Sequence, residues 1–133
     1  MDWEPLIAAA ASARVNSYSP YSRFPVGAAL LMEDGSIFAG TNVESTIPSL
    51  AVCAERNAMT AAVSAGRRRP VALAVVTETS PPAYPCGLCR QTLSEFADDD
   101  LPILVCNPQG EREEVRLSDL LPQRFKLDWP VTP

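Results

Sequence analysis

Three of the four cysteines in this sequence lie in two short segments, and these segments restrict how the chain can fold. The first segment is Cys53-Ala54-Glu55, and the second is Pro85-Cys86-Gly87-Leu88-Cys89. The residues that follow each segment favour a helix, so both segments are predicted at helix N-termini. If the three thiols bind one metal ion, the fold must bring the starts of two helices together.

The predicted position of these thiols suits a zinc site. Free N–H groups and a partial positive charge at a helix N-terminus lower the pKa of a thiol and favour the thiolate that zinc requires. Three protein ligands are typical of a catalytic zinc, which keeps its fourth position for water. We therefore expect Cys53, Cys86 and Cys89 to bind Zn²⁺. Glu55 lies beside them as a carboxylate that can take a proton from water and deliver it to a leaving amine.

Other interpretations of the cysteines stay open. A lone Cys-x-x-Cys also occurs in redox motifs and structural zinc ribbons, whereas the full pattern matches the three-cysteine form of the zinc deaminase signature. Cys106 as a fourth ligand would close the site, but its apolar strand favours packing as a small hydrophobe. Arg56 either offsets the net negative charge of three thiolates on Zn²⁺ or is an exposed helix arginine.

Length and charge narrow the class of protein. A chain of 133 residues predicts one domain over residues 1–133. The net charge of −5 argues against nucleic acid as a substrate or partner, and small neutral substrates remain open. The basic run 67–69 is expected to be a solvated helix end. Without a long apolar run or a basic N-terminal segment, no membrane association is expected and a cytoplasmic location is predicted.

The order of the predicted elements indicates an α/β fold. Asp34-Gly35 between two apolar runs predicts a hairpin, residues 41–52 predict a loop, and Asp2 and Ser118 are predicted helix caps. Strands that alternate with helices favour a layered domain around a mixed five-stranded sheet. Helices are predicted over residues 3–16, 53–65, 86–97 and 119–121, and strands over residues 24–32, 37–40, 71–77, 102–106 and 111–117, before a Pro-rich tail.

Five ordered motifs together resemble the small homotetrameric zinc-dependent cytidine deaminases. The resemblance covers nearly the whole chain. The motifs are the stretch Tyr18–Leu30, Asn42-Val43-Glu44, Cys53–Ala58, Pro85–Gln91, and Leu120-Leu121-Pro122 with Phe125. The resemblance implies a three-layer α/β/α cytidine-deaminase-like domain. It also implies one Zn²⁺ per subunit and a homotetramer with active sites shared between subunits. The implied reaction is hydrolytic deamination of cytidine and 2′-deoxycytidine to the uridines, with release of ammonia, in pyrimidine salvage.

The resemblance also implies roles for single residues. Cys53, Cys86 and Cys89 would ligate zinc, and Glu55 would protonate N3 and later the departing amine. The substrate-binding residues would be Phe24 on the pyrimidine ring, Asn42 and Glu44 on the ribose hydroxyls, the Ala54 backbone on the base edge, and Phe125 closing the pocket of a neighbouring subunit. Taken alone, Phe24 also fits a core position, Asn42 a turn and Glu44 a solvated loop.

One segment departs from the family pattern. After Glu44 the family usually has Asn-Ala and soon a Tyr, whereas this chain has Ser45, Thr46 and Pro48. The segment shapes the sugar side of the family's pocket, so the departure leaves room for a modified cytosine nucleoside of the blasticidin type. A non-catalytic zinc-stabilised binding protein, with a site completed by Cys106, is the alternative from another class. A deaminase acting on RNA or DNA conflicts with the net charge.

Overall fold

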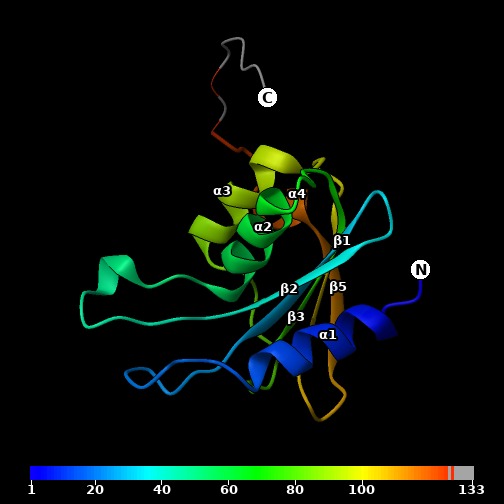
Figure 1. Cartoon of the computed structure of the whole chain (residues 1–133). Coiled ribbons are helices and arrows are strands. Elements are labelled where there is room, and N and C mark those ends of the chain that lie inside the picture. The colour runs from blue at the N-terminus through cyan, green and yellow to red at the C-terminus, as the bar shows by residue number, and fades with distance from the viewer. Residues whose placement is uncertain (126, 128–133) are drawn as a thin grey trace.

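A mixed five-stranded sheet forms the centre of the computed structural model, which describes residues 1–125 and 127 (Figure 1). The strands lie in the order β2-β1-β3-β4-β5. β3 and β4 are parallel, and the other neighbouring strands pair antiparallel. This arrangement confirms the predicted α/β class. The strands are β1 (Gly27–Met32), β2 (Ile37–Thr41), β3 (Pro70–Val76), β4 (Pro102–Cys106) and β5 (Arg112–Arg116).

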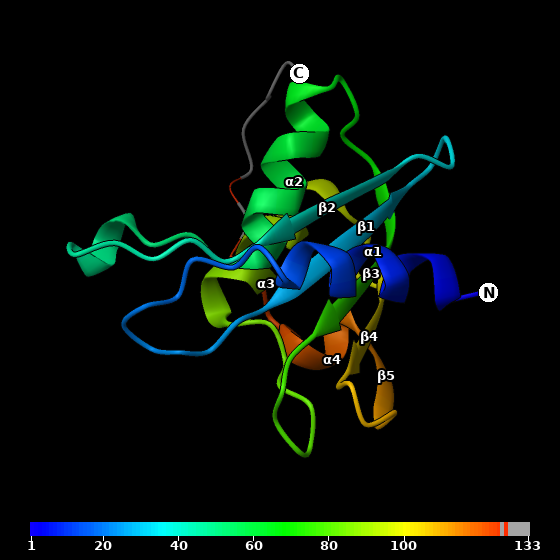
Figure 2. The ribbon, with the colours of Figure 1, turned by 60° about the horizontal axis from the view of Figure 1, so that its bottom comes forward.

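Helices cover both faces of the sheet and give the expected three layers (Figure 1 and Figure 2). Helix α1 (Glu4–Arg14) covers one face, where it contacts β1, β2 and β3. The other face carries α2 (Ala54–Ser64), α3 (Gly87–Phe96) and the short α4 (Leu117–Leu120). In the described part of the chain, no helix is both long and apolar enough to cross a membrane.

The central strand β3 contributes to apolar cores on both faces. Leu73 and Val75 face the core under α2 and α3, while Ala74 and Val76 face the core under α1. A strand buried on both sides has no polar alternation, which is why residues 71–77 show none. The parallel pair β3–β4 therefore lies at the centre of the fold, with the ends of its strands close to the starts of α2 and α3.

Two glycines let helices lie directly on the sheet. A Cβ atom added at Gly27 would lie 1.9 Å from the Ala10 carbonyl oxygen of α1. A Cβ atom at Gly40 would lie 2.5 Å from both the Ala54 oxygen and the Ala58 nitrogen of α2. Because side-chain-free positions permit this approach, the first turn of α2 is held against β2. That contact fixes the place where Cys53 begins the helix.

Several element ends differ from the prediction. Helix α1 is shorter than residues 3–16, and Asp2 accepts the Glu4 N–H at 3.1 Å while Trp3 is the N-cap residue. Ser118 does not cap the last helix, which starts at Leu117, because the Asp119 carboxylate accepts the N–H of Arg116 at 2.8 Å. The Pro-rich tail lies mostly outside the described residues.

Two loops project together beyond the sheet, and we call residues 17–24 and 42–52 the arm (Figure 1 and Figure 2). Isolated bridges join Tyr18 to Val43 and Val43 to Val52. The Glu44 N–H donates to the Tyr18 oxygen at 2.8 Å, and a 3₁₀ turn covers Pro48–Leu50. The predicted loop 41–52 is therefore an ordered two-stranded projection with a short turn.

Candidate active site

The three predicted ligand thiols meet at the starts of two helices. Cys53 is the N-cap of α2, Cys86 is the N-cap of α3, and Cys89 lies in the first turn of α3. Their Sγ atoms are separated by 3.6 Å between Cys53 and Cys86 and by 3.4 Å between Cys86 and Cys89. All three lie within 4.8 Å of one another. Tetrahedral zinc with Zn–S bonds of about 2.3 Å needs sulfurs about 3.8 Å apart, so this donor set fits Zn²⁺.

The thiols share their protons unequally. Hydrogen bonding from Cys89, together with that from Cys86 and the charge of Arg56, lowers the pKa of Cys53 to about 5 against the opposing effect of burial. The same contact with Cys53, together with burial, raises the pKa of Cys89. Within the contact between Cys53 and Cys89, Cys53 is therefore the thiolate. A thiolate at the start of α2 is the form that a zinc ion binds.

Glu55 is a buried carboxyl beside the thiols. Only 5% of the residue is exposed, and burial raises the pKa of its side chain to about 7. The negative charge that develops on Cys53 raises this pKa further. Glu55 lies in the first turn of α2, immediately after Ala54. A carboxyl whose pKa is near neutrality can both accept and donate a proton at physiological pH.

Arg56 lies against the thiols and does not extend into solvent. Its Nη2 donates to the Ala51 oxygen at 3.2 Å, and its Nε is buried without a hydrogen-bond partner among the described residues. Partial burial opposes its charge, but contact with the sulfur of Cys53 raises the pKa of the guanidinium. Arg56 therefore faces the sulfurs with a positive charge, as its charge-balancing interpretation requires.

Cys106, the fourth cysteine, lies in a different part of the fold. It is buried in the core under α1, and its Sγ lies 3.5 Å from the Val75 oxygen. It is not part of the three-thiol group. The prediction that Cys106 packs as a small hydrophobe is confirmed, and the described residues offer this site three thiols.

A cavity of about 190 Å³ opens beside Cys53, Cys86 and Glu55. It brings together the predicted substrate residues from the arm and from α2. Cys89 lies behind this surface and is fully buried. The lining residues are Ser22, Phe24, Val26, Asn42, Glu44, Cys53, Ala54, Glu55, Val75, Thr77, Tyr84 and Cys86.

Phe125 lies away from this cavity. It is 68% exposed and its carbonyl oxygen accepts a hydrogen bond from Gln91 at 3.1 Å. It lines a larger cavity of about 470 Å³ beside α3, which contains no thiol. We identify the smaller cavity as the candidate active site because thiols and a buried carboxyl line it, although the other cavity is larger.

Similarity to known proteins agrees with this geometry. The chain matches the family model "Cytidine and deoxycytidylate deaminase zinc-binding region" over residues 2–105. The chain belongs to this deaminase family. It is 50% identical to a cytidine deaminase of Sporosarcina psychrophila over 128 residues, which are 96% of this chain and 94% of that protein. The crystal structure of cytidine deaminase from Burkholderia pseudomallei matches with a TM-score of 0.90 and 45% identity, covering 94% of this chain and 100% of that one.

A relative that is named for a different substrate is less similar. A blasticidin-S deaminase of Bacillus cereus is 30% identical over 108 residues, which are 75% of this chain and 76% of that protein. The chain is thus nearer in sequence to the cytidine deaminase of Sporosarcina psychrophila than to this antibiotic deaminase.

The predicted sugar contacts in this deaminase fold already have partners within the chain. Asn42 Oδ1 accepts the Val26 N–H at 2.9 Å and the Ser17 hydroxyl at 2.6 Å, and Asn42 Nδ2 donates to the Phe24 oxygen at 2.8 Å. Among the residues that the structure describes, one amide N–H of Asn42 has no such partner. The residue therefore holds the segment that carries Phe24, in addition to facing the cavity.

Glu44 is bound to the same loop. Its Oε1 accepts the N–H groups of Tyr21 at 3.0 Å and Ser22 at 3.1 Å, and its Oε2 accepts the Ser22 hydroxyl at 2.5 Å. The Ser22 hydroxyl, followed by these backbone contacts, lowers the pKa of the Glu44 carboxyl. Glu44 thus lines the cavity as a carboxylate with lone pairs still free for a further donor.

Some cavity residues were not predicted. Thr77 ends β3 and could have been found from the rule that α/β sheets bind ligands at the carboxyl ends of their strands. Ser22 lies inside the motif Tyr18–Leu30. Its hydrogen bond to Glu44 was not predicted, because it forms where two loops that are separate in the sequence come together. Tyr84 immediately precedes Pro85-Cys86, and its hydroxyl hydrogen-bonds Glu113 of β5.

Proposed function

We propose that this chain catalyses the hydrolytic deamination of cytidine and 2′-deoxycytidine to uridine and 2′-deoxyuridine with release of ammonia. The observation that carries the proposal is the buried carboxyl of Glu55 in a cavity that also exposes the Cys53 and Cys86 sulfurs. A proton-transfer group beside a three-thiol metal site is the arrangement that zinc-dependent deamination requires.

Cys53, Cys86 and Cys89 would hold one Zn²⁺ per subunit, with Arg56 offsetting their charge. When bound, zinc supplies an activated water for attack on C4 of the cytosine ring. Glu55 would take a proton from that water and deliver it to N3. It would then take the proton of the hydroxyl added at C4 and deliver it to the departing amine, so that ammonia leaves. Water and the nucleoside are consumed, and ammonia and the uridine are produced, so atoms balance without an oxidant or reductant.

The other cavity residues would bind and orient the substrate. Phe24 packs on the pyrimidine ring, and the Ala54 backbone with Glu55 reads the base edge. The remaining N–H of Asn42 donates to a ribose hydroxyl, and the free lone pairs of Glu44 accept from one. Neutral nucleosides suit this cavity because the Glu44 carboxylate already accepts hydrogen bonds within the chain and Glu55 lies at the metal site.

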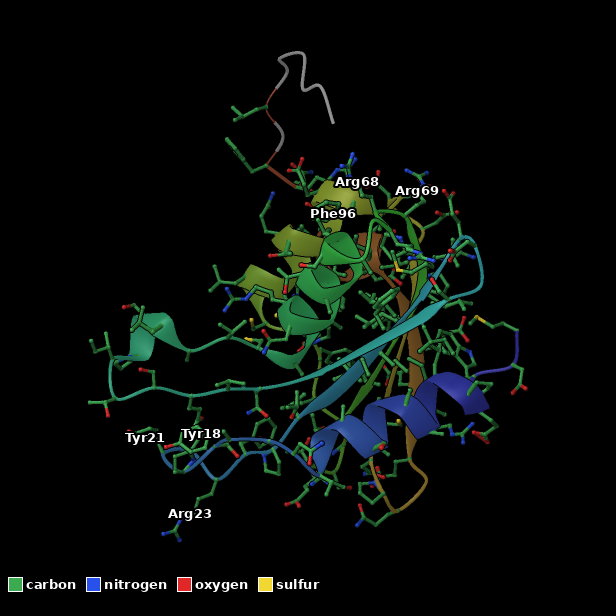
Figure 3. All side chains as sticks on the ribbon, in the orientation of Figure 1. Tyr18, Tyr21, Arg23, Arg68, Arg69 and Phe96 are labelled. Carbon is green, nitrogen blue, oxygen red and sulfur yellow. The ribbon has the colours of Figure 1, made fainter. Side chains whose placement is uncertain are left out.

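Assembly into a homotetramer with shared active sites is part of the proposal. The arm exposes apolar side chains, and Figure 3 shows Tyr18 and Tyr21 toward the end of the arm while Arg23 points away from the domain. Phe125 is exposed and does not line the cavity of its own subunit, so it would close that of a neighbour. Exposed apolar patches of this kind mark contacts between subunits.

The cysteines, the domain organisation and the charge of the chain fit this activity. All four cysteines are free thiols, which fits the reducing cytosol. One cytidine-deaminase-like domain over residues 1–133 would act on nucleosides in pyrimidine salvage, without a nucleic-acid or membrane partner. The net charge of −5 supports small molecules over polyanions.

A modified cytosine nucleoside of the blasticidin type is the second candidate substrate. Ser45, Thr46 and Pro48 favour it, since Thr46 bonds the Tyr21 hydroxyl at 2.6 Å and so shapes the arm beside Glu44. Purified protein is assayed by loss of cytosine absorbance with cytidine, 2′-deoxycytidine and blasticidin S. Higher kcat/KM for the two simple nucleosides supports the proposal. Turnover of the antibiotic alone supports the second candidate, and no turnover by zinc-loaded protein contradicts both.

A further inference from the structure

We infer that Arg14 is a positioning residue that fixes the cavity wall carrying Phe24 from the opposite face of the sheet. Arg14 is the last residue of α1, and its Nε donates to the Pro25 carbonyl oxygen at 3.2 Å. Its Nη2 is shielded from solvent and lies 2.5 Å from Glu78 Oε1. Arg14 itself does not line the cavity. The inference rests on the proposed role of Phe24 on the pyrimidine ring.

The segment from Phe24 to Val26 is held by side chains at each backbone polar group. The Phe24 N–H donates to the Ser22 hydroxyl at 3.1 Å, and the Phe24 oxygen accepts from Asn42 at 2.8 Å. Val26 donates its N–H to Asn42 at 2.9 Å and accepts at its oxygen from Thr41 at 2.8 Å. Pro25 has no N–H, so its carbonyl is the one remaining group, and Arg14 supplies its donor.

Glu78 connects the same guanidinium to a second segment that lines the cavity. It follows Thr77, which lines the cavity at the end of β3. Gly27 of β1 pairs with Val76 of β3, so the entry to β1 and the exit from β3 are neighbours in the sheet. Arg14 therefore joins the two backbone segments that bound the cavity at this edge.

Arginine suits this task because its guanidinium donates to the Pro25 oxygen through Nε and places its positive charge beside the Glu78 carboxylate through Nη2. The side chain of Arg14 is 17% exposed, whereas that of Glu78 is 64% exposed. A lysine is a single point charge, so it can serve one of these two partners but not both with the same geometry. Without both contacts, the Phe24 segment has fewer constraints. The ring then binds the base less well in the ground state and the transition state alike, which raises KM and leaves kcat nearly unchanged.

The experiment measures KM and kcat for cytidine in zinc-loaded Arg14→Gln, Arg14→Lys and Glu78→Gln. Arg112→Gln is the matched control, because Arg112 also contacts α1, through Glu4 at 2.9 Å, but bonds no residue of the cavity wall. Arg14→Gln is expected to raise KM about fivefold with kcat within about twofold, and Glu78→Gln to give a smaller rise in the same direction. Arg14→Lys restores part of the loss, and Arg112→Gln changes neither constant.

A double-mutant cycle with Phe24→Leu identifies the route of the effect. If Arg14 acts through Phe24, Arg14→Gln adds little to the KM of Phe24→Leu. Fully additive effects, an unchanged KM, or an equal effect of Arg112→Gln would overturn the inference. If Phe24→Leu alone has normal KM, the proposed role of Phe24 is wrong and the inference fails with it. If Arg14→Gln does not fold, the test rests on Glu78→Gln, which changes the exposed partner of Arg14. A wild-type KM in Glu78→Gln would then overturn the inference.

Discussion

The side-chain amide of Asn42 donates a hydrogen bond to the carbonyl oxygen of Phe24 at 2.8 Å. The same side chain accepts the N–H of Val26 at 2.9 Å, so it spans the backbone of three successive residues. A residue proposed to bind the sugar thus also holds the aromatic ring proposed to bind the base. The two halves of a nucleoside site are connected through one amide.

Asn42→Asp tests this connection. The substitution keeps an oxygen that accepts the Val26 N–H. It replaces the amide nitrogen that donates to the Phe24 carbonyl with a second oxygen, which repels that carbonyl oxygen. We expect a loss of about 1–3 kcal/mol in the free energy of unfolding and a higher KM for cytidine, because a part-buried carbonyl loses its partner. Denaturant unfolding and steady-state kinetics measure the two effects. Asn16→Asp, at an exposed position, is the control, and equal behaviour of the two variants would contradict the connection.

Removal of single cysteines distinguishes ligands from packing residues. Cys86→Ser is expected to lose bound zinc and turnover, since the hydroxyl is a poor replacement for a thiolate. Cys106→Ala is expected to keep one zinc per subunit and near-normal kcat, while losing about 1 kcal/mol of stability from a small buried cavity. Zinc is measured by metal analysis after dialysis. Loss of zinc from Cys106→Ala would instead support a site with four ligands, in which Cys106 also binds the metal.

The buried carboxyl of Glu55 predicts a pH-dependent stability of the metal-free protein. Its pKa is about 7 in the folded chain, against 4.5 for an unperturbed glutamate. Between these pH values the folded state binds a proton that the unfolded chain releases, so stability falls as pH rises through this window. Glu55→Gln removes that dependence. It should be more stable than wild type by up to about 3 kcal/mol at pH values above 7 and nearly equal below 4.5.

Urea unfolding of chelator-treated protein at acid and alkaline pH measures this difference. Glu33→Gln, which removes an exposed carboxyl, is the matched control for the loss of one negative charge. If the stability gain of Glu55→Gln over wild type were larger at acid pH than at alkaline pH, the expected pH dependence would be contradicted.

The close approach of α2 to β2 predicts a steric effect at Gly40. A Cβ atom there would lie 2.5 Å from backbone atoms of Ala54 and Ala58, so α2 must shift. Gly40→Ala is expected to cost about 1–3 kcal/mol of stability and to weaken zinc binding, since Cys53 begins that helix. Gly87→Ala adds the same methyl group where no atom lies within 4 Å, and thermal unfolding should show no loss. Similar melting temperatures for both variants would contradict the packing argument.

The sequence alone predicted the parts of the site that depend on local structure. Cys53, Cys86 and Glu55 lie at helix starts, which capping and strand-to-helix patterns locate well. The parts that depend on loops meeting were not predicted, such as the bond between Ser22 and Glu44. The incorrect cap at Ser118 has a local cause, because the helix begins at Leu117 with Arg116 as its N-cap residue, and the Asp119 carboxylate accepts the Arg116 N–H.

The alanines of the α2 segment show a similar limit. In the sequence, Ala54, Ala58, Ala61 and Ala65 are spaced so that they could share one face of a helix. The structure buries Ala54, Ala58 and Ala62 against the sheet, while Ala61 and Ala65 are exposed. Alanine occurs at so many positions of this helix that composition does not fix which face turns inward. The position of Gly40 on β2 decides it.

The most direct test of this account compares cytidine turnover and zinc content in wild type and Glu55→Gln. Wild type should deaminate cytidine with one zinc per subunit. Glu55→Gln should keep the zinc but lose about 10²–10⁴-fold in kcat, because it retains the volume of the side chain and removes the proton-transfer group. Equal turnover by the two proteins, or no turnover by zinc-loaded wild type, would contradict the central claim that Glu55 moves protons beside a three-cysteine zinc site.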